Sequence, residues 1–431
     1  MDYQEKLQDF FAFIEESVSP SHCVEAGIRR LQAAGFEELK MEDYWHAENG
    51  KKYYVNVRGT SLFAVSINRK FRYGQGFRMA GAHTDWPCFR VKPLADMKDA
   101  RYHRLNVECY GGPILSTWMD RPLSLAGVVA VRGEDPFHPI RRLVDFGRPV
   151  LTIPNLCIHQ NRQVNDGVAL KKQVDMLPLL DFVKASLEQH SFLDYLAEEI
   201  GVSASDILDY DLSVYNMDRP CLCGIQNDMV SSPRLDNLSS CYAALTGLIA
   251  GQRESGIDVI YLTDHEEVGS ASAQGADSEM FSMLLERLMQ ALNHDRTRFL
   301  EMLPHSLLVS ADAAHAIHPN KPATTDPTNP VSLDGGVVMK LSYNQRYATD
   351  SCVTAIVQGI CEKNGIPCQK FVNHSDVRGG STIGAISSTH LPIPIADIGG
   401  PMLAMHSSRE LISAKSQLEL NQFMTALFQE D

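Results

Sequence analysis

The chain has 431 residues, of which 44% are hydrophobic and 21% charged, a composition typical of folded rather than disordered proteins. This length exceeds what one compact core usually supports, so two domains or one elaborated domain are expected. The formal net charge of −14 disfavours nucleic acid and anionic membranes as partners, because an acidic surface repels both.

The first part of the chain carries apolar residues at helical spacing. Leu7, Phe10 and Ile14 recur on one face, and the Ser19-Pro20 step interrupts the pattern before a second helical stretch. The N-terminal segment shows no basic stretch followed by an apolar run, so no signal peptide is expected. No stretch approaches the roughly 18 apolar residues of a membrane span. Since ten cysteines are scattered along the chain, several within apolar segments, we expect a cytoplasmic protein with reduced thiols and no membrane partner.

Strand patterns follow the helical region. Residues 52–58 and 61–67 are predicted as strands around a Gly-Thr turn, and 77–83 as a short strand that runs into a polar loop. From about residue 86 the sequence consists of short β-like segments separated by Gly and Pro, with a helical passage near 175–200. We therefore predict an inserted β-rich domain over residues 86–231.

Helical and strand patterns alternate from residue 232 onward. Helices are expected at 239–251, 281–292 and 348–365, and strands at 257–263, 305–311 and 392–398. This alternation favours an α/β fold in which helices sandwich a mixed, mainly parallel sheet. Residues 1–85 and 232–431 would together form this discontinuous domain, and the insertion would interrupt it.

The short signatures of common enzyme classes are absent: the sequence contains no HExxH, GxSxG, GxxxxGK or GxGxxG. Candidate site residues instead follow predicted strands, where ligands bind in open α/β sheets. His83 and Asp85, in GAHTDWP, are separated by one residue, so the carboxylate can orient the imidazole and raise its basicity toward a metal. A surface-loop histidine with an acid nearby is the alternative.

Two further carboxylate motifs carry the same ambiguity. Asp236, in SPRLDNLSS, precedes an apolar helix, where a helix N-cap is the alternative to a metal ligand. Glu266 and Glu267 follow the apolar strand 257–263, and adjacent carboxylates repel each other. The pair makes sense if one glutamate binds a metal and the other accepts a proton from the attacking water. A solvated acidic turn is the alternative.

Asp312 follows the strand 305–311, and His406 lies in a nearly apolar loop, where a lone histidine is more often a satisfied core residue. Taken together, the motifs supply two imidazoles and several carboxylates at strand ends. This is the ligand set of two divalent ions about 3.5–4 Å apart. Oxygen ligands with imidazole suit Zn, and also Co or Mn.

A family resemblance extends these motifs over most of the chain. The sequence resembles the M18 metallopeptidases, the aspartyl aminopeptidases, in strings that occur in one order: GAHTDWPCFRVKP, IPNLCIH, RLDNL, DHEEVGS, SADAAHAIHPN, NQRYATD, GGSTIG and LAMHSSRE. The resemblance implies a metallo-exopeptidase fold and a dinuclear centre. It also implies removal of N-terminal Asp or Glu from peptides with a free N-terminus.

The resemblance assigns the metal ligands residue by residue. It implies that Asp236 bridges two divalent ions, most readily Zn, while His83 and Asp312 complete one site and Glu267 and His406 complete the other. The inserted domain would mediate dimerisation, and the dimers would assemble into a homododecamer whose active sites face an interior chamber.

The remaining roles also come from the resemblance. Glu266 would be the general base on the water that bridges the metals, and Asp85 would orient His83. His159, in IPNLCIH, matches a histidine that reaches a neighbouring subunit's active site, where a donor could stabilise the oxyanion. A structural histidine in a β-rich domain is the alternative.

An acidic side chain at the substrate's N-terminus requires a cation in the pocket. Lys340 is the first candidate, with Tyr347 as a nearby donor, although an exposed strand-end lysine is the alternative. Arg346 and Arg378 compete for the same role. Two other functions remain open: a co-catalytic aminopeptidase of broad neutral specificity, and a catalytically silent assembly protein that uses the same fold.

Overall fold

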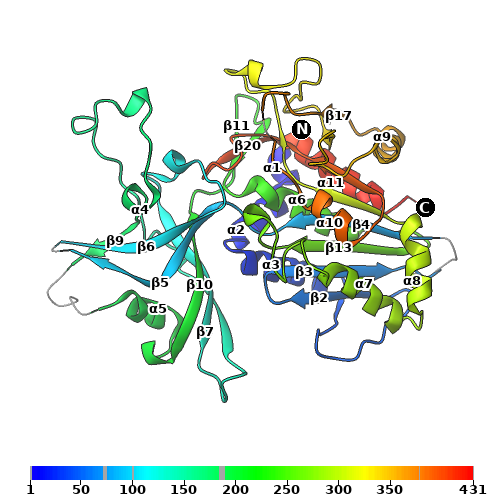
Figure 1. The fold of residues 1–431 in the computed structure, drawn as a ribbon, viewed down its shortest axis with the longest axis horizontal. Coiled ribbons are helices and arrows are strands. Elements are labelled where there is room, and N and C mark those ends of the chain that lie inside the picture. The colour runs from blue at the N-terminus through cyan, green and yellow to red at the C-terminus, as the bar shows by residue number, and fades with distance from the viewer. Residues whose placement is uncertain (1, 71–74, 100, 184–189, 378, 431) are drawn as a thin grey trace. The chain divides into compact units, whose positions relative to one another are not determined.

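The computed structural model describes residues 2–70, 75–99, 101–183, 190–377 and 379–430. By its internal contacts the chain divides into two compact units (Figure 1). The first unit runs up to Trp86, resumes over Pro220–Met405 and again from Glu410, and the second unit comprises Pro87–Arg219 and His406–Arg409.

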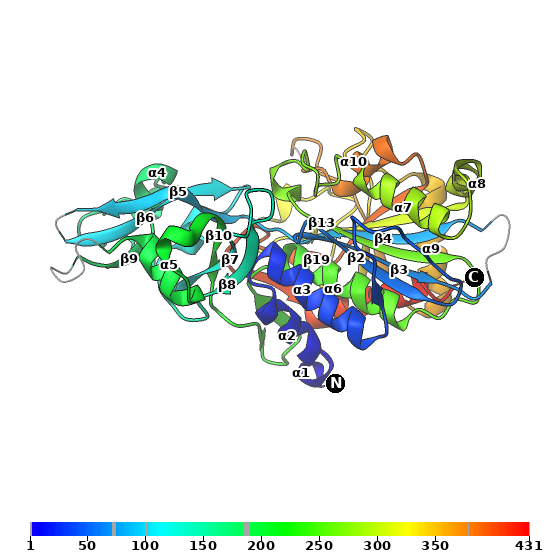
Figure 2. The ribbon, with the colours of Figure 1, turned by 90° about the horizontal axis from the view of Figure 1, so that it is seen from below.

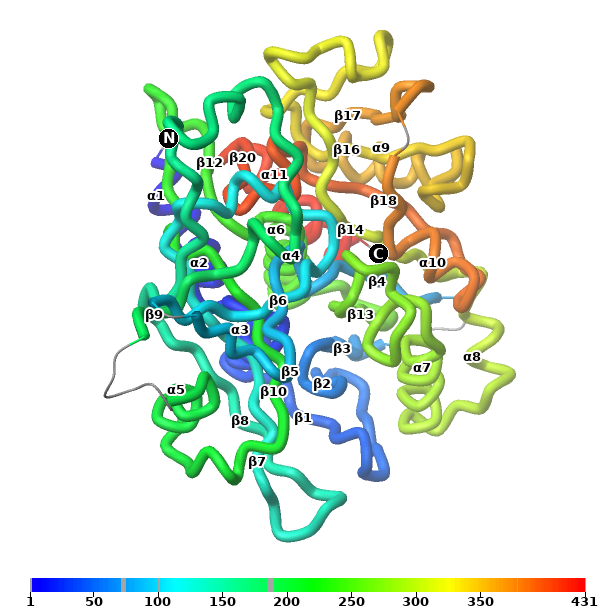
Figure 3. The backbone as a smooth tube through the Cα atoms, turned by 60° about the vertical axis from the view of Figure 1, so that its left-hand side comes forward, coloured from blue at the N-terminus to red at the C-terminus, as the bar shows by residue number. Residues whose placement is uncertain are grey.

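The first unit is built on a nine-stranded mixed sheet in the order β1-β2-β3-β13-β4-β14-β18-β16-β17. Figure 3 shows the strands following one another in this order. The strands are β1 (Glu37–Glu38), β2 (Lys52–Val57), β3 (Ser61–Ile67), β4 (Phe77–His83), β13 (Ile257–Thr263), β14 (Leu307–Ala311), β16 (Val337–Lys340), β17 (Cys368–Phe371) and β18 (Ile395–Gly399). The central strands β13, β4, β14 and β18 are parallel, so their carboxyl ends lie at one edge.

Helices cover both faces of this sheet. Figure 2 shows α3 and α6 on one face of the sheet and α7, α8 and α10 on the other. The helices of this unit are α1 (Tyr3–Lys6), α2 (Gln8–Glu16), α3 (Pro20–Ala33), α6 (Leu235–Ala250), α7 (Met280–Ala291), α8 (Arg296–Met302), α9 (Ser351–Asn364), α10 (Ile383–His390) and α11 (Ala414–Leu427). The predicted mixed, mainly parallel sheet between helices is confirmed.

Local sequence explains several of these elements. The run IDVIYLT forms β13 and is buried at every position, as expected for a strand covered on both faces. Ser19 accepts the backbone N–H of His22 and Pro20 occupies the first turn, so α3 begins where the sequence places a helix start. In α7 the apolar face packs on the sheet, with the Phe281 ring stacked 4.7 Å from that of Tyr261.

A small second sheet in the same unit changes the predicted domain boundary. Its strand order is β11-β12-β20-β19-β15, with β11 (Cys221–Cys223), β12 (Met229–Ser232), β20 (Glu410–Ser413), β19 (Pro401–Leu403) and β15 (Ala314–His315). The predicted insertion extends to residue 231, but the pairing of β12 with β20 keeps residues from Pro220 onward in the first unit.

The segment His406–Arg409, predicted as part of 232–431, groups with the second unit instead. Its backbone is tied there because the Ser408 N–H donates to Thr117 Oγ1 at 2.9 Å and Asn216 Nδ2 donates to the Ser408 carbonyl at 3.0 Å. A tetrapeptide that crosses between units has no compositional signal, so the sequence pattern could not reveal it.

The second unit contains a six-stranded antiparallel sheet in the order β8-β7-β10-β5-β6-β9. Its elements are β5 (Cys88–Lys98), β6 (Tyr102–Tyr110), β7 (Leu123–Val131), β8 (Ile140–Asp145), α4 (Lys172–Asp175), β9 (Leu179–Phe182), α5 (Phe192–Ile200) and β10 (Ile207–Asn216). The helical passage predicted near 175–200 is correct only for α5, because β9 is a strand, and residues 184–189 lie outside the described residues. Among the described residues, no helix has both the length and the apolar character needed to cross a bilayer.

Candidate active site

Carboxylates and an imidazole meet where the central strands of the large sheet end. His83 is the last residue of β4, Glu266 and Glu267 lie in a 3-10 turn after β13, and Asp312 follows β14. Asp236 joins them from the first turn of α6. Potential ligand atoms of His83, Asp236 and Asp312 lie within 4.8 Å of one another, as do those of His83, Glu266 and Glu267.

The imidazole of His83 lies at the centre of this group. Its Nε2 atom is 3.5 Å from Asp236 Oδ1, 3.5 Å from Asp312 Oδ1 and 3.9 Å from Glu266 Oε2. These separations are longer than ordinary hydrogen bonds and suit ligand atoms that share an ion. The side chain of His83 is 1% exposed, so its imidazole is shielded from water.

Asp85 supports both the imidazole and the glutamate turn. The Nδ1 atom of His83 lies 3.0 Å from the Asp85 carbonyl oxygen and 3.3 Å from Asp85 Oδ1. The same carboxylate accepts the backbone N–H groups of Glu266 and Glu267, each at 3.1 Å. Asp85 therefore contacts the imidazole of His83 and fixes the two glutamates relative to it, while its orienting role stays a prediction.

The group holds more negative charge than its buried surroundings favour. Burial raises the pKa of Glu266 to about 8, opposed by His83 and reinforced by Asp312. Burial, followed by the charge of Asp236, raises the pKa of Glu267 well above its ordinary value. The pKa of His83 is also raised well above normal, because the carboxylates outweigh the opposing effect of burial. A divalent cation would neutralise this surplus charge, so the residues present fit a metal centre.

Three supporting residues were not predicted from the sequence. Glu410 Oε2 accepts the backbone N–H of Asp236 at 3.0 Å, and Asn237 Nδ2 donates to the Ala311 carbonyl at 2.8 Å. The thiol of Cys241 donates to the His83 carbonyl at 3.0 Å. These contacts hold Asp236 and His83 in place. Asp236 is not the N-cap of α6, because Arg234 occupies the cap position and its side chain makes no cap hydrogen bond.

Sequence comparison agrees with this geometry. The profile of the family described as Aminopeptidase I zinc metalloprotease (M18) matches residues 13–428. A protein of Clostridium novyi (strain NT) named "Probable M18 family aminopeptidase 2" is 44% identical over 401 residues and covers 93% of each chain. The chain belongs to the M18 family. It is a metallo-aminopeptidase, and the predicted resemblance is confirmed.

Solved structures of similar proteins share the fold. The structure titled "Cryo-EM structure of the Ape4 and Nbr1 complex" matches with a TM-score of 0.95 at 33% identity, covering 99% of this chain and 86% of the other. The one titled "Structure of S. cerevesiae mApe1 dodecamer" matches with a TM-score of 0.86 at 25% identity, covering 99% and 97%.

In this M18 chain the candidate cation Lys340 is buried beside Asp312. Its exposed fraction is 2%, so the alternative of an exposed strand-end lysine is wrong. The ammonium donates to Asp312 Oδ2 at 3.3 Å and to the Ala313 carbonyl at 3.0 Å, and it lies 5.1 Å from the centroid of the Tyr347 ring. Although burial alone would raise the pKa of Asp312, the charge of Lys340 helps to hold it below normal.

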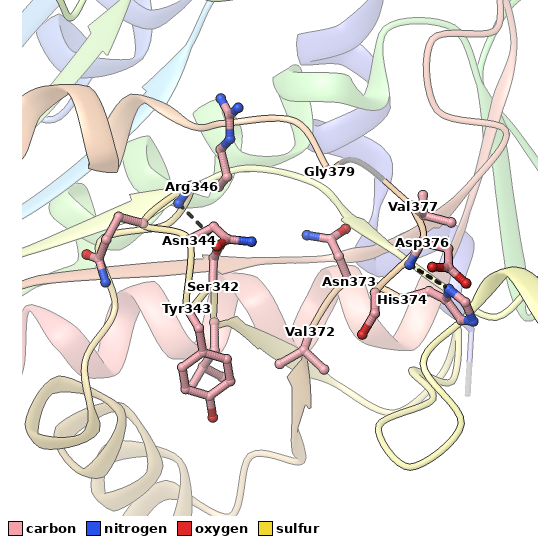
Figure 4. A pocket seen from close by; sticks show the side chains of 13 residues that line it. Ser342, Tyr343, Asn344, Arg346, Val372, Asn373, His374, Asp376, Val377 and Gly379 are labelled. Atoms are coloured by element: carbon pink, nitrogen blue, oxygen red, sulfur yellow. Dashed lines mark hydrogen bonds between the residues drawn. The ribbon is translucent and has the colours of Figure 1, made fainter.

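The competing cation Arg346 lies in a different environment. It lines an open cavity of about 680 Å³ formed by the loops that follow β16 and β17. Figure 4 shows its side chain extending away from the ring of Tyr343, while its backbone N–H donates to Ser342 Oγ at 3.2 Å. Arg378 lies outside the described residues.

Two predicted site residues belong to the second unit. His159 is exposed in a turn where Leu156 and Ile158 are also exposed, at 55% and 49%. His406 has a positive φ of 66°, and its Nδ1 atom lies 3.2 Å from the Gly112 carbonyl oxygen. If Nδ1 carries the proton, Nε2 remains the coordinating nitrogen. The roles of both histidines stay predictions.

A buried carboxylate that the sequence analysis did not single out supports the Tyr347 loop. Asp397, in β18, accepts the backbone N–H of Ala348 at 2.5 Å and the hydroxyl of Thr382 at 2.6 Å on its two oxygens. Its own N–H donates to Thr349 Oγ1 at 2.7 Å. No motif marks this residue, because its partners come from distant parts of the chain.

Replacing Asp397 by Asn should destabilise the protein, because an amide cannot accept hydrogen bonds on both of its terminal atoms. We expect the free energy of unfolding to fall by about 1–3 kcal/mol, the cost of one unmet buried hydrogen bond. Chemical denaturation measures this change, with the exposed Asp376→Asn as a control. Equal stability of the two variants would show that Asp397 does not anchor the loop.

Proposed function

We propose that this chain is a dinuclear metallo-aminopeptidase that removes N-terminal Asp or Glu from peptides. The observation that supports the proposal is the buried group of His83, Asp236, Glu267 and Asp312 at the strand ends, with Glu266 beside them. A single imidazole facing several carboxylates is a ligand set for divalent ions, and Glu266 provides a base within the same group.

We assign the ligand roles as the family resemblance implies them. His83, Asp236 and Asp312 would hold one ion, and Asp236, Glu267 and His406 would hold the other. Zinc is the expected metal, given the description of the family as zinc metalloproteases, with Co or Mn as substitutes. When bound, the ions would polarise the scissile carbonyl and lower the pKa of the attacking water.

Glu266 moves the proton in this scheme. Its carboxylate is mostly buried, with 14% of the side chain exposed, and its backbone N–H is held by Asp85. It accepts a proton from the attacking water and donates it to the leaving amine as the peptide bond breaks. Asp85 contributes by holding His83 and the turn of Glu266 and Glu267 in fixed positions relative to each other.

The acidic preference is assigned to Lys340 and Tyr347. A buried ammonium next to the metal group offers a charge-assisted partner for the substrate's first side chain. Two of its three acceptors are backbone carbonyls, of Asp312 and Ala313, which carry no net charge and so compete weakly with a substrate carboxylate.

Replacing Lys340 by Met should therefore change specificity more than turnover. We expect kcat/KM for an Asp-peptide to fall about 10–100-fold, mainly through KM, because one charge-assisted contact is lost. The Leu-peptide should change far less. Exposed Lys370, on neighbouring β17, provides the matched control Lys370→Met. Equal losses on both peptides would contradict the assignment, and a wild-type enzyme without acidic preference would favour the broad neutral specificity.

The assembly is also part of the proposal. We infer a dodecamer built from dimers through the second unit, since a similar solved protein is titled a dodecamer. The exposed loop with His159 would then reach a neighbouring subunit, where its imidazole would stabilise the oxyanion. The cytoplasm is the proposed compartment, where the free thiols would stay reduced.

A further inference from the structure

A second cavity, of about 260 Å³, lies just beyond Asp312 in the first unit. Its floor is formed by Ala316, Phe371 and Met402, which are 7%, 4% and 2% exposed. Leu403 and Met405 are half-buried along its side. Of the described lining residues eight are apolar, none is Asp, Glu, Lys or Arg, and six are polar: His315, His318, Thr324, Thr325, Asn373 and His374.

The chain connects this cavity to the proposed metal centre. Strand β15 begins two residues after Asp312 and pairs with β19, with His315 opposite Met402. The Ala316 N–H donates to the Met402 carbonyl at 3.0 Å, which holds the segments that follow β15 and contain β19 together. Met405, at the end of the second of these segments, immediately precedes the predicted ligand His406.

Phe371 also lies near the residues proposed to bind the acidic first side chain of the substrate. The Phe371 ring lies 6.4 Å from that of Tyr347, which in turn lies 5.1 Å from the Lys340 ammonium. Phe371 also contacts the His315 ring at 5.9 Å. The cavity thus adjoins the Tyr347–Phe371 pair without including Lys340. Val372 and Asn373, labelled in Figure 4, line both this cavity and the larger polar one.

We propose that this cavity binds the side chain of the peptide's second residue and selects an apolar or aromatic one. The inference rests on the proposed function, because it assumes that the first residue occupies the site beside Lys340. The bond to be cleaved joins these two residues, so the second side chain must lie next to the ligand group. A lining with more apolar than polar side chains and no Asp, Glu, Lys or Arg favours Leu or Phe and disfavours a charged side chain there.

The test uses metal-loaded protein and four peptides, Asp-X-Ala-Ala with X as Ala, Leu, Phe or Lys. We expect kcat/KM for Leu and Phe to exceed that for Ala by about tenfold or more, with Lys lowest. Leu403→Glu should reverse the order of Leu and Lys. Leu300→Glu on α8, where the wild-type side chain is 49% exposed, is the control and should keep the wild-type order.

Similar rates for all four peptides, or an unchanged order in Leu403→Glu, would overturn this subsite. Should Leu403→Glu fail to fold, Leu403→Ala replaces it: the wider cavity should raise the ratio of Phe to Leu, and an unchanged ratio counts against the subsite. Failure to cleave any of the peptides after metal loading would instead contradict the proposed removal of N-terminal Asp, so the two failures are distinguishable.

Discussion

Glu266→Gln should lower kcat by about 10²–10⁴-fold, because the amide retains the size of the side chain but cannot accept the proton of the attacking water. The side chain sits within the ligand group, 3.9 Å from His83 Nε2, yet it is not assigned as a ligand. Metal content and melting temperature should therefore change little. Steady-state kinetics on an Asp-peptide, together with elemental analysis of the same sample, measure both quantities.

A surface variant, Glu254→Gln, controls for the general effect on kcat of replacing a glutamate by glutamine. Glu254 is exposed and pairs only loosely with Lys70 at 3.3 Å, so Glu254→Gln should retain wild-type kinetics. Near-normal turnover by metal-loaded Glu266→Gln would show that another group accepts the proton, and the mechanistic assignment would fail even if the metal centre stands.

Metal removal should abolish activity and also destabilise the fold. Without cations, the carboxylates of Asp236, Glu267 and Asp312 face one another in a buried group, and a bound ion relieves that repulsion. A ligand present at 1,000 times its Kd stabilises the native state by about 4 kcal/mol, so chelation should lower the melting temperature by several degrees. Adding Zn, Co or Mn back should restore both activity and melting temperature.

The variant Asp236→Asn provides the control for this experiment. It removes the ligand proposed to be shared by both ions, so its melting temperature should respond much less to chelator than that of the wild type. A wild-type protein whose activity and melting temperature both ignore chelation would contradict a metal centre at this position.

Much of the site could be predicted from sequence because it follows strand ends. The strands β4, β13 and β14 are short and mainly apolar, and each ends at a polar motif. Parallel pairing then brings those motifs to one edge of the sheet without further information. His83 and Glu266 therefore approach each other although far apart in sequence.

The supporting contacts could not be predicted in this way. Glu410, Cys241 and Asp397 act on residues distant in the chain, and their local sequence carries no periodic or motif signal. Lys340 could be singled out as a cation, but only the packed structure shows that it is buried against Asp312. Strand β9 differs from the helix predicted there, because short apolar runs fit either element.

If distant side chains converge on a pair of divalent ions, the number of ions bound per chain depends on Asp236. Protein purified without chelator and equilibrated with zinc should contain two ions per chain, whereas Asp236→Ala should contain fewer than one. Wild-type protein that holds no zinc, or an Asp236→Ala variant with an unchanged metal content, would show that Asp236 does not hold a shared pair of ions.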